Sequence, residues 1–340
     1  MRKLILAIVL LLALIFIFIN LAEVEAVVET LQRGDWRFIL LAFCLQAAWM
    51  VSVAACCRVV YRAIGLNESL ERLVLLVAAA NFFNVIAPSG GVGGISVFVA
   101  QARKRGYSSA RVTVAGAVVV LFDYLAFLCI LLLGLIVLLR RHNLNAAEVT
   151  ASAAFLVAAV VLAVLIYKGM HSADSLAKAL AWMARQVNRF LLMFIHREYL
   201  SEKRAHSFAY EAAEGLQRLR REPKSLMVPF GLSLTSKTLL ILILLSVFVA
   251  FKVPFSIGTL IGGFSIGYLF MIVSPTPAGI GFVEGFLTIG LTSLNVPLGE
   301  ATVITLAYRG VTFWVPLIFG MWAFRWLSRE EQLPASVPNE

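Results

Sequence analysis

The sequence predicts an all-α integral membrane protein with six transmembrane helices and two opposed re-entrant helical hairpins, arranged as an inverted repeat. Three observations support this class. The 340 residues are 61% hydrophobic and only 14% charged, whereas soluble domains carry about 25% charged residues. Several apolar runs exceed the roughly 18 residues that a bilayer span requires. Proline and glycine clusters interrupt two of these runs.

Six stretches are apolar along their whole length and are expected to cross the membrane completely. The first follows Arg2 and Lys3 and is longer than the apolar part of a secretory signal, roughly 7–15 residues, so we expect it to be retained. Residues 1–340 then form a single polytopic membrane domain. The predicted spans are residues 4–22, 37–60, 112–139, 150–168, 226–251 and 301–326.

Two further apolar stretches, residues 72–100 and 256–295, are interrupted near their centres. The first contains the run Pro-Ser-Gly-Gly-Val-Gly-Gly from Pro88 to Gly94, and the second contains Ser-Pro-Thr-Pro-Ala-Gly-Ile-Gly over residues 274–281. Proline removes an N–H donor and clashes with the preceding turn, and clustered glycines weaken a helix. We therefore expect each stretch to enter the membrane, turn and leave on the same side.

The distribution of basic residues sets the orientation. With an inside N-terminus, 22 Lys and Arg fall on the cytoplasmic side, five outside and two within the membrane, in agreement with the positive-inside rule. Both termini are then cytoplasmic. The net charge of +10 is divided among short loops and is not gathered on one soluble face, so no nucleic-acid partner is expected.

Residues 37–139 and residues 226–326 are predicted to be two inverted repeats. Each contains a span, a hairpin and a second span, but the first hairpin enters from inside and the second from outside. Many alternating-access transporters are built from such repeats, with broken helices meeting near the midplane. Residues 169–225 between them form a basic helical connector. This connector is either a solvated cytoplasmic segment or a helix on the anionic surface of the inner leaflet.

Four ionisable residues are expected at one depth near the midplane. At 1.5 Å per residue each lies about 12–16 Å from one end of its helix, in a hydrocarbon core about 30 Å thick. One such charge costs about 2.5–3.5 kcal/mol at the centre of a span, so we expect all four to face the protein interior. The four are Asp123, Lys237, Glu284 and Arg309.

Two interpretations of these charges stay open. In the first they form structural salt bridges, with Asp123 paired to Arg309 and Lys237 paired to Glu284. In the second they surround a polar cavity in which ion pairs open and close as a charged head group passes.

The half-helices that follow the two interruptions offer a second candidate feature. Unpaired N–H groups and the positive end of the helix dipole favour an anion such as a phosphate at these N-termini. Asn81 and Asn84 either line the same cavity or cap the broken helix, whereas Gly263 and Gly267 are expected to serve helix packing. The candidate residues beside the four charges are Asn84, Gly90, Gly91, Gly93, Pro277, Gly279, Gly281 and Tyr308.

Residues that membrane catalysis requires are missing from the predicted spans. All four histidines fall in loops or in the connector, and Asp123 is the one aspartate within a span. The sequence contains no HExxH, Walker A, GxSxG or dinucleotide-binding motif, and the four cysteines lack metal-ligand spacing. We therefore expect a protein that is not an enzyme and that has no cofactor and no metal site.

Several of these motifs resemble one known family. The run from Asn84 to Gly94, the basic run from Arg103 to Arg105 and the Pro-Thr-Pro-x-Gly-x-Gly-x-x-Glu-Gly segment at 275–285 are followed by Tyr308-Arg309. Together they are similar to the membrane domain of bacterial lysylphosphatidylglycerol synthase/flippase proteins over nearly the whole chain. Glu284 and Arg309 match the motif best.

The resemblance implies lipid handling in the inner membrane of a bacterial-type cell. In that family a separate soluble C-terminal domain attaches the amino acid, and we expect no such domain after the last span. The expected partners are a phospholipid or another polar lipid and the anionic inner-leaflet surface. A homodimer and a lipid-synthesis enzyme are both left open as protein partners.

The combined expectation is a lipid flippase with a charged midplane cavity. Phosphate would meet the half-helix N-termini and Arg309 or Lys237, while Asp123 and Glu284 would balance charge or receive a cationic head group. One alternative is a non-transporting scaffold of a lipid or glycolipid pathway that binds enzymes through residues 169–225. Another is a transporter of a small anionic solute.

Overall fold

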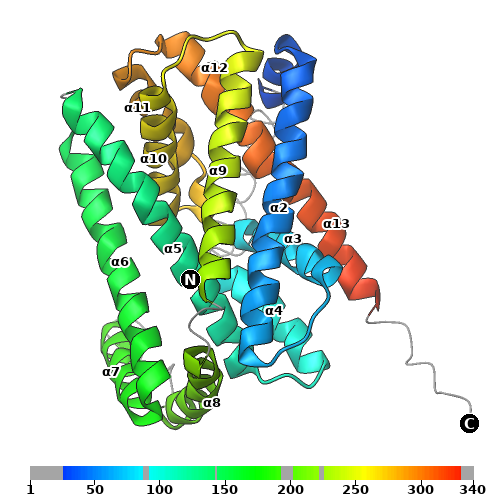
Figure 1. The fold of residues 1–340 in the computed structure, drawn as a ribbon, viewed down its shortest axis with the longest axis vertical. Coiled ribbons are helices and arrows are strands. Elements are labelled where there is room, and N and C mark those ends of the chain that lie inside the picture. Colours follow the sequence, from blue (N-terminus) through cyan, green and yellow to red (C-terminus); the bar gives the residue numbers. More distant parts are fainter. Residues whose placement is uncertain (1–25, 87–91, 142–143, 193–201, 222–225, 331–340) are drawn as a thin grey trace, which may run out of the picture.

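The computed structural model describes residues 26–86, 92–141, 144–192, 202–221 and 226–330, which form helices joined by short turns, with no strand in these ranges (Figure 1). Five helical segments are long and apolar enough to cross a membrane. The expected all-α membrane protein is therefore confirmed. The first predicted span, residues 4–22, lies outside the described ranges, so the count of six stays a prediction.

Four predicted spans correspond to single helices. Local signals set their ends: the Asp35 side chain accepts the N–H of Arg37 at 3.0 Å at the start of the first, and Gly65, with φ of 84°, ends it. The fifth is a rod in three parts. The single helices are α2 (Trp36–Ile64), α5 (Ser109–Arg140), α6 (Ala146–His171) and α9 (Met227–Ala250), and the rod is α12 (Leu298–Arg309), η3 (Gly310–Trp314) and α13 (Val315–Glu330).

Both interrupted stretches form pairs of helices that pack against each other. The first pair is α3 (Leu70–Ile86) and α4 (Val92–Lys104), and its turn, including Gly90 and Gly91, lies outside the described residues. The second is α10 (Ile257–Val273), the short turn η2 (Pro277–Gly279) and α11 (Phe282–Ser293). Figure 1 shows α3 and α4 in the lower half of the bundle and α10 and α11 in the upper half, with the second break near mid-height.

The second break is fixed by its own side chains and backbone. The Thr276 N–H donates to Ser274 Oγ at 3.1 Å, and the Thr276 hydroxyl donates to the Ile280 carbonyl at 2.8 Å. Gly279 adopts a φ of 74°, which glycine tolerates because it has no Cβ. Ala278 also has a positive φ, of 50°, a conformation that strains a residue with a side chain.

Close packing joins α10 to α11, as expected for Gly263 and Gly267. A Cβ on Gly263 would lie 2.6 Å from the Leu291 side chain, and one on Gly267 would lie 3.4 Å from Leu287. The two glycines therefore let the arms of the second pair approach each other.

The last rod widens into a π-helical turn at η3, which the sequence pattern does not reveal. Pro316 follows this turn and has no N–H, and in a regular helix its ring would meet the carbonyl of Thr312. The chain instead forms a wider turn from Gly310 to Trp314. Such turns are frequent at functional sites, and this one borders the cavity described below.

Two hydrophobic clusters hold the bundle together. One cluster contains buried residues of α5, α6, α9 and α12. The other contains buried residues of α2, α3, α4 and α5 together with residues of α7, α8 and α13. Trp49 of α2 packs against both clusters. The order of a long helix, a helix pair and a second long segment holds in both halves of the chain. That the halves are inverted repeats stays a prediction.

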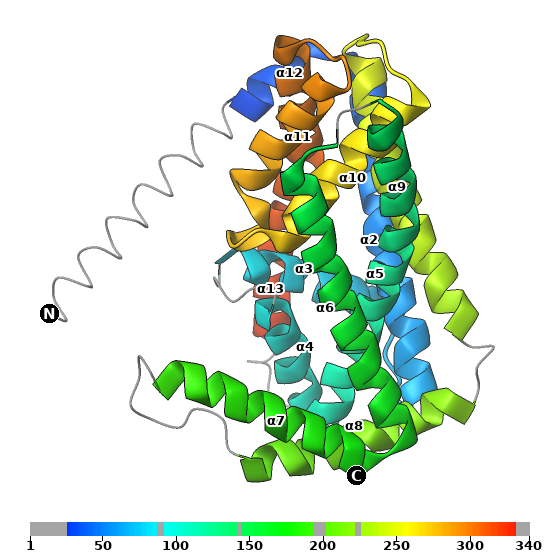
Figure 2. The same ribbon diagram turned by 90° about the vertical axis from the view of Figure 1, so that its left-hand side faces the viewer.

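The connector between the halves contains two amphipathic helices, α7 (Ala173–Leu192) and α8 (Glu202–Arg221). They pack against each other, and α8 also contacts α2, α5 and α6. Arg111 of α5 donates to Glu214 of α8 at 2.7 Å, and this contact lowers the pKa of the Glu214 carboxyl. Figure 2 shows α7 lying across the lower end of the bundle, crosswise to α6. Its contact with a leaflet stays a prediction.

The contact between α3 and α13 provides a test of the fold. A Cβ on Gly320 would lie 2.3 Å from the Ala78 carbonyl oxygen. The added methyl group would overlap the α3 backbone at Ala78, and the two helices would have to move apart. We therefore expect Gly320→Ala to lower the Tm of the purified protein in detergent by several degrees. The matched control is Gly116→Ala in α5, where a Cβ would meet nothing within 4 Å.

Gly116→Ala should keep or raise the Tm, since alanine favours a helix over glycine by about 1 kcal/mol. Equal Tm values for the two variants would contradict the close contact between α3 and α13.

Candidate functional site

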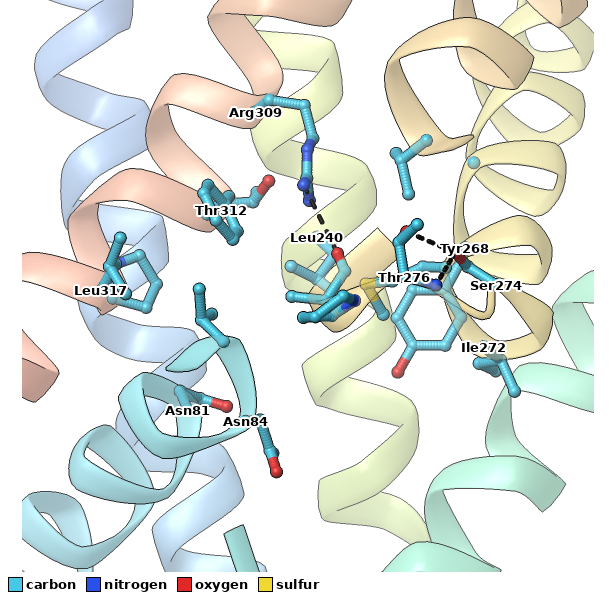
Figure 3. Close-up of a pocket in the computed structure, with 18 of the residues that line it drawn as sticks. Asn81, Asn84, Leu240, Tyr268, Ile272, Ser274, Thr276, Arg309, Thr312 and Leu317 are labelled. Carbon is cyan, nitrogen blue, oxygen red and sulfur yellow. Dashed lines mark hydrogen bonds between the residues drawn. The ribbon is translucent and has the colours of Figure 1, made fainter. Parts of the chain in front are cut away.

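A cavity of about 440 Å³ lies between the C-terminal part of α3 and the turn that follows α10. Its wall comes from α3, from α10 with the turn that follows it, and from the rod α12–η3–α13, together with Trp49 of α2, Tyr124 of α5 and Leu240 of α9. Figure 3 shows Asn81 and Asn84 on one side of this space and Arg309 and Thr312 on the other. The cavity thus forms where the breaks remove regular helix from the centre of the bundle.

Arg309, at the end of α12, holds the second break together. Its Nε donates to the carboxylate of Glu284 in the first turn of α11, and its Nη2 donates to the Ala278 carbonyl at 3.4 Å. The same carboxylate accepts the N–H of Gly281 at 2.6 Å. The guanidinium carbon lies 4.5 Å from the centroid of the Phe313 ring. One cation therefore contacts both sides of the turn between α10 and α11.

A second ion pair lies beside the cavity. Lys237 of α9 donates both to the Asp123 carboxylate of α5 and to the hydroxyl of Tyr268 on α10. The Tyr268 hydroxyl donates to the other oxygen of Asp123 at 2.9 Å. Tyr268 lines the cavity, whereas Asp123 and Lys237 do not. This triad joins three helices and reaches the cavity through the tyrosine ring.

The observed pairs correct the expected salt bridges. Asp123 pairs with Lys237 and not with Arg309, and Glu284 pairs with Arg309 and not with Lys237. Counting residues along a helix gives a height but not the direction in which a side chain points. Because α5 contacts α9, and α11 contacts α12, each acid meets the base on its neighbouring helix.

In both pairs the base is more deeply buried than the acid. The side chains of Lys237 and Arg309 are 1% and 4% exposed, whereas those of Asp123 and Glu284 are 29% and 18% exposed. Removing one partner of a buried pair typically costs about 3–5 kcal/mol, because a charge is then left unpaired. Separating either cation from its carboxylate would therefore cost several kcal/mol of folding free energy.

At each half-helix N-terminus one N–H group is capped from within the protein. The Gly94 N–H donates to Asn84 Oδ1 at 2.6 Å, and the Gly281 N–H donates to Glu284. Asn84 thus both caps α4 and lines the cavity, so both expectations for it hold. Asn81 lines the cavity. An anion would have to displace a side chain to reach either of these N–H groups.

The structure brings some predicted site residues to the cavity and not others. Asn84, Pro277, Tyr308 and Arg309 line it. Gly93 is buried at the start of α4, and the positive φ angles of Gly279 and Gly281 shape the second turn. Glu284 lies behind the wall and is bound to Arg309. Asp123 and Lys237 also lie behind the wall, and both are hydrogen-bonded to Tyr268. Gly90 and Gly91 lie outside the described residues.

Several lining residues were not predicted. Tyr124 follows Asp123 in the sequence and Thr312 lies one turn beyond Tyr308, so proximity to the charged residues would have been a usable signal. Trp49 and Tyr268 carry no such signal, because they lie in uninterrupted apolar helices.

The fold and the site define a multi-pass α-helical membrane protein with a central cavity lined by polar and apolar side chains. The chain belongs to the family of the lysylphosphatidylglycerol synthase transmembrane region, whose model matches residues 4–320. The resemblance carried by the sequence motifs is therefore confirmed.

Relatives of similar length include UPF0104 membrane proteins from three archaea. The protein of Methanothermobacter thermautotrophicus is 22% identical over 316 residues, covering 91% of this chain and 90% of the relative. That of Methanocaldococcus jannaschii is 22% identical over 330 residues, with 95% of each chain covered. That of Pyrococcus horikoshii is 24% identical over 334 residues, covering 90% and 92%.

The Asp123–Lys237 pair provides a test of the site's energetics. Asp123→Asn leaves the buried Lys237 ammonium without its counter-charge, and we expect a loss of about 3–5 kcal/mol in unfolding free energy in detergent. The double variant Asp123→Asn/Lys237→Met should recover much of that loss.

Arg33→Gln, which breaks an exposed pair with Glu29, is the control and should cost less than about 1 kcal/mol. If the effects of Asp123→Asn and Lys237→Met simply add in the double variant, the two side chains do not interact as described.

Proposed function

We propose that this protein is a lipid flippase that moves a phospholipid or related polar lipid between leaflets and catalyses no reaction. The proposal places it in the cell membrane of a bacterial-type cell, with both termini in the cytoplasm. The observation that carries it is the cavity of about 440 Å³ between α3 and the turn that follows α10, with Arg309 in its wall. A partly polar chamber within an otherwise apolar bundle gives a head group a place to cross while its acyl chains stay in lipid.

In this proposal the two helix pairs are re-entrant hairpins. The helices α3 and α4 lie in the lower half of the bundle, and α10 and α11 lie in the upper half (Figure 1). The basic run Arg103-Lys104-Arg105 at the end of α4 favours the cytoplasmic side for the first pair. Broken helices that meet from opposite sides are typical of transporters with alternating access.

The ion pairs have a defined role in this mechanism. Arg309 fastens α12 to the second turn, and Asp123–Lys237 fastens α5 to α9. Closure of the chamber from one side and opening toward the other would require these contacts to loosen and reform. No nucleotide-binding motif is present in the sequence, so the proposed movement runs down a gradient or is coupled to an ion.

In the small-anion alternative the substrate would meet Arg309, the basic residue in the described wall, which is paired with Glu284. A cavity closed to the bilayer on all sides would favour this alternative over a flippase. The scaffold alternative would use α7, where Lys178, Trp182 and Arg185 are exposed on one face. Charge reversal on α7 would then abolish function while changes in the cavity would have little effect.

Cysteine labelling tests the proposed re-entry. In a background without native cysteines, Asn67→Cys and Lys104→Cys flank the first pair, and Phe255→Cys and Leu298→Cys flank the second. All four positions are exposed. A membrane-impermeant maleimide should label the first two from the cytoplasmic side and the last two from the outside. Labelling of Phe255→Cys and Leu298→Cys from opposite sides would show that the second pair spans the membrane.

Transport in proteoliposomes tests the site. The double variant Glu284→Gln/Arg309→Gln should slow transbilayer movement of a fluorescent phosphatidylglycerol at least about tenfold, since it removes the ionic contact that joins α12 to the moving turn. The same double exchange at the exposed Glu29–Arg33 pair is the matched control and should transport normally.

Arg309→Lys, which keeps the charge but loses the planar fork, should give an intermediate rate and covers the case in which the double variant does not fold. An unchanged rate in a folded Glu284→Gln/Arg309→Gln variant would rule out this site.

A further inference from the structure

We infer that Asp123 is a proton-binding site and that the proton is the ion to which transport is coupled; this rests on the proposed flippase function and names its coupling ion. Three features support the inference. The carboxylate is partly exposed while its cation is buried, its hydrogen bonds can accommodate an added proton, and packing leaves space on the face of α5 that carries it.

The Asp123 carboxylate is the accessible member of its ion pair. Its side chain is 29% exposed, whereas that of Lys237 is 1% exposed. Phe127 and Ile130, one and two turns further along α5, share its face of the helix, and both are buried. Asp123 therefore points toward the interior of the bundle, and its exposed part does not lie on the lipid face of α5.

Packing also leaves space on this face closer to the start of α5. Gly116 lies two turns before Asp123 on the same face, and a Cβ there would meet nothing within 4 Å. The basic run at residues 103–105 comes shortly before α5 and favours the cytoplasmic side for this end of the helix. The arrangement gives protons an approach to Asp123 from the cytoplasm.

The hydrogen bonds around Asp123 can accommodate a proton. The carboxylate accepts from Lys237 and from the Tyr268 hydroxyl. A protonated carboxyl group keeps acceptor capacity for both donors and adds one O–H donor. Because the Asp123 side chain is partly exposed, water can accept from this new donor. One bound proton thus leaves no polar atom of the triad without a partner.

The other paired acid is bound differently. Glu284 accepts the Gly281 N–H at 2.6 Å as well as the Arg309 guanidinium, and hydrogen bonds to an ionised carboxylate favour that form. A proton on Glu284 would weaken the cap of α11 and an ion pair together. Asp123 caps no helix, so it is the better proton acceptor of the two.

Binding a proton changes the charge at the junction of α5 and α9. A neutral Asp123 leaves the buried Lys237 ammonium without its counter-charge, which destabilises the contact between the two helices. Conversely, a carboxylate that loses a neighbouring cation binds a proton more readily. Proton binding and the intact pair therefore oppose each other, and a proton favours the conformation in which α5 and α9 have separated.

The other titratable groups near the pair are thiols and phenols, which are neutral near pH 7. Those within electrostatic reach of Asp123 or Tyr268 are Cys56 of α2, Tyr124 of α5 and Tyr308 of α12. The charged groups that α4 and α8 direct at α5 are Arg103, Glu211 and Glu214, and they bond its first turn and the residue before it. Those of α6 lie in its first and last turns. Among these groups Asp123 is the one that can bind the coupling proton.

Proton coupling is tested with the full chain in proteoliposomes that carry fluorescent phosphatidylglycerol and enclose the pH dye pyranine. We expect an imposed pH gradient to change the rate of lipid movement at least about tenfold, and we expect protons to move with the lipid. Asp123→Asn should abolish both effects, and Asp123→Glu should retain them. Asp123→Asn/Lys237→Met, which leaves no unpaired charge, replaces Asp123→Asn should that variant not fold. Glu300→Gln, an exposed acid at the start of α12, is the control and should behave as the unmodified protein.

Cysteine labelling tests the approach along α5 without transport. In a background without native cysteines, a membrane-impermeant methanethiosulfonate should modify Gly116→Cys from the cytoplasmic side at least about tenfold faster than Leu132→Cys, because the reactive thiolate forms in water and not in lipid. Leu132 is 53% exposed on the opposite face of α5. Equal rates at the two positions would overturn the cytoplasmic approach.

The outcomes separate this inference from the proposed function. Lipid movement that ignores the pH gradient and carries no protons would overturn the inference and leave the flippase proposal standing. No movement of any lipid would overturn the flippase proposal. The inference would then depend on the labelling rate of Gly116→Cys divided by that of the exposed Asn67→Cys, measured at acidic and neutral pH. A ratio that changes with pH only while Asp123 is present supports proton binding there, and a constant ratio would overturn it.

Discussion

Two cations buried in an apolar bundle, Lys237 and Arg309, determine how the central helices of this protein meet. A charge in a low-dielectric interior must find a counter-charge and hydrogen-bond partners, or the fold loses several kcal/mol. Lys237 takes its partners from α5 and α10, and Arg309 takes its partners from η2 and α11. These requirements place α5, α9 and α10 side by side and hold the second helix break against the last rod. The cavity exists because that break is held open at this position.

The four ionised side chains pair with one another and join the central helices, and Arg309 among them also lines the cavity. The rest of the described wall combines amides, hydroxyls and aromatic rings with aliphatic side chains. Membership of the lysylphosphatidylglycerol synthase transmembrane-region family favours a lipid as the guest.

Sequence patterns were sufficient for the helices and insufficient for their contacts. Apolar runs predicted the described spans to within a few residues, and the proline and glycine clusters predicted both breaks. The partners predicted for Asp123 and Lys237 were wrong, because residue counting carries no information about rotation around a helix. The π-helical turn before Pro316 and the place of Trp49 in the wall depend on packing between distant segments, which leaves no local signature in the sequence.

Tyr268 gives the cavity a direct connection to the junction between the two halves of the chain. Its ring faces the chamber, while its hydroxyl bonds both members of the Asp123–Lys237 pair. A guest that draws this hydroxyl away therefore removes one hydrogen bond from the acid and one from the base at the same time. Thermodynamic reciprocity then requires that any rearrangement that weakens the pair also changes the affinity for the guest. In this way the Tyr268 side chain would couple the binding of a guest in the cavity to the conformation of the helices that Asp123 and Lys237 join.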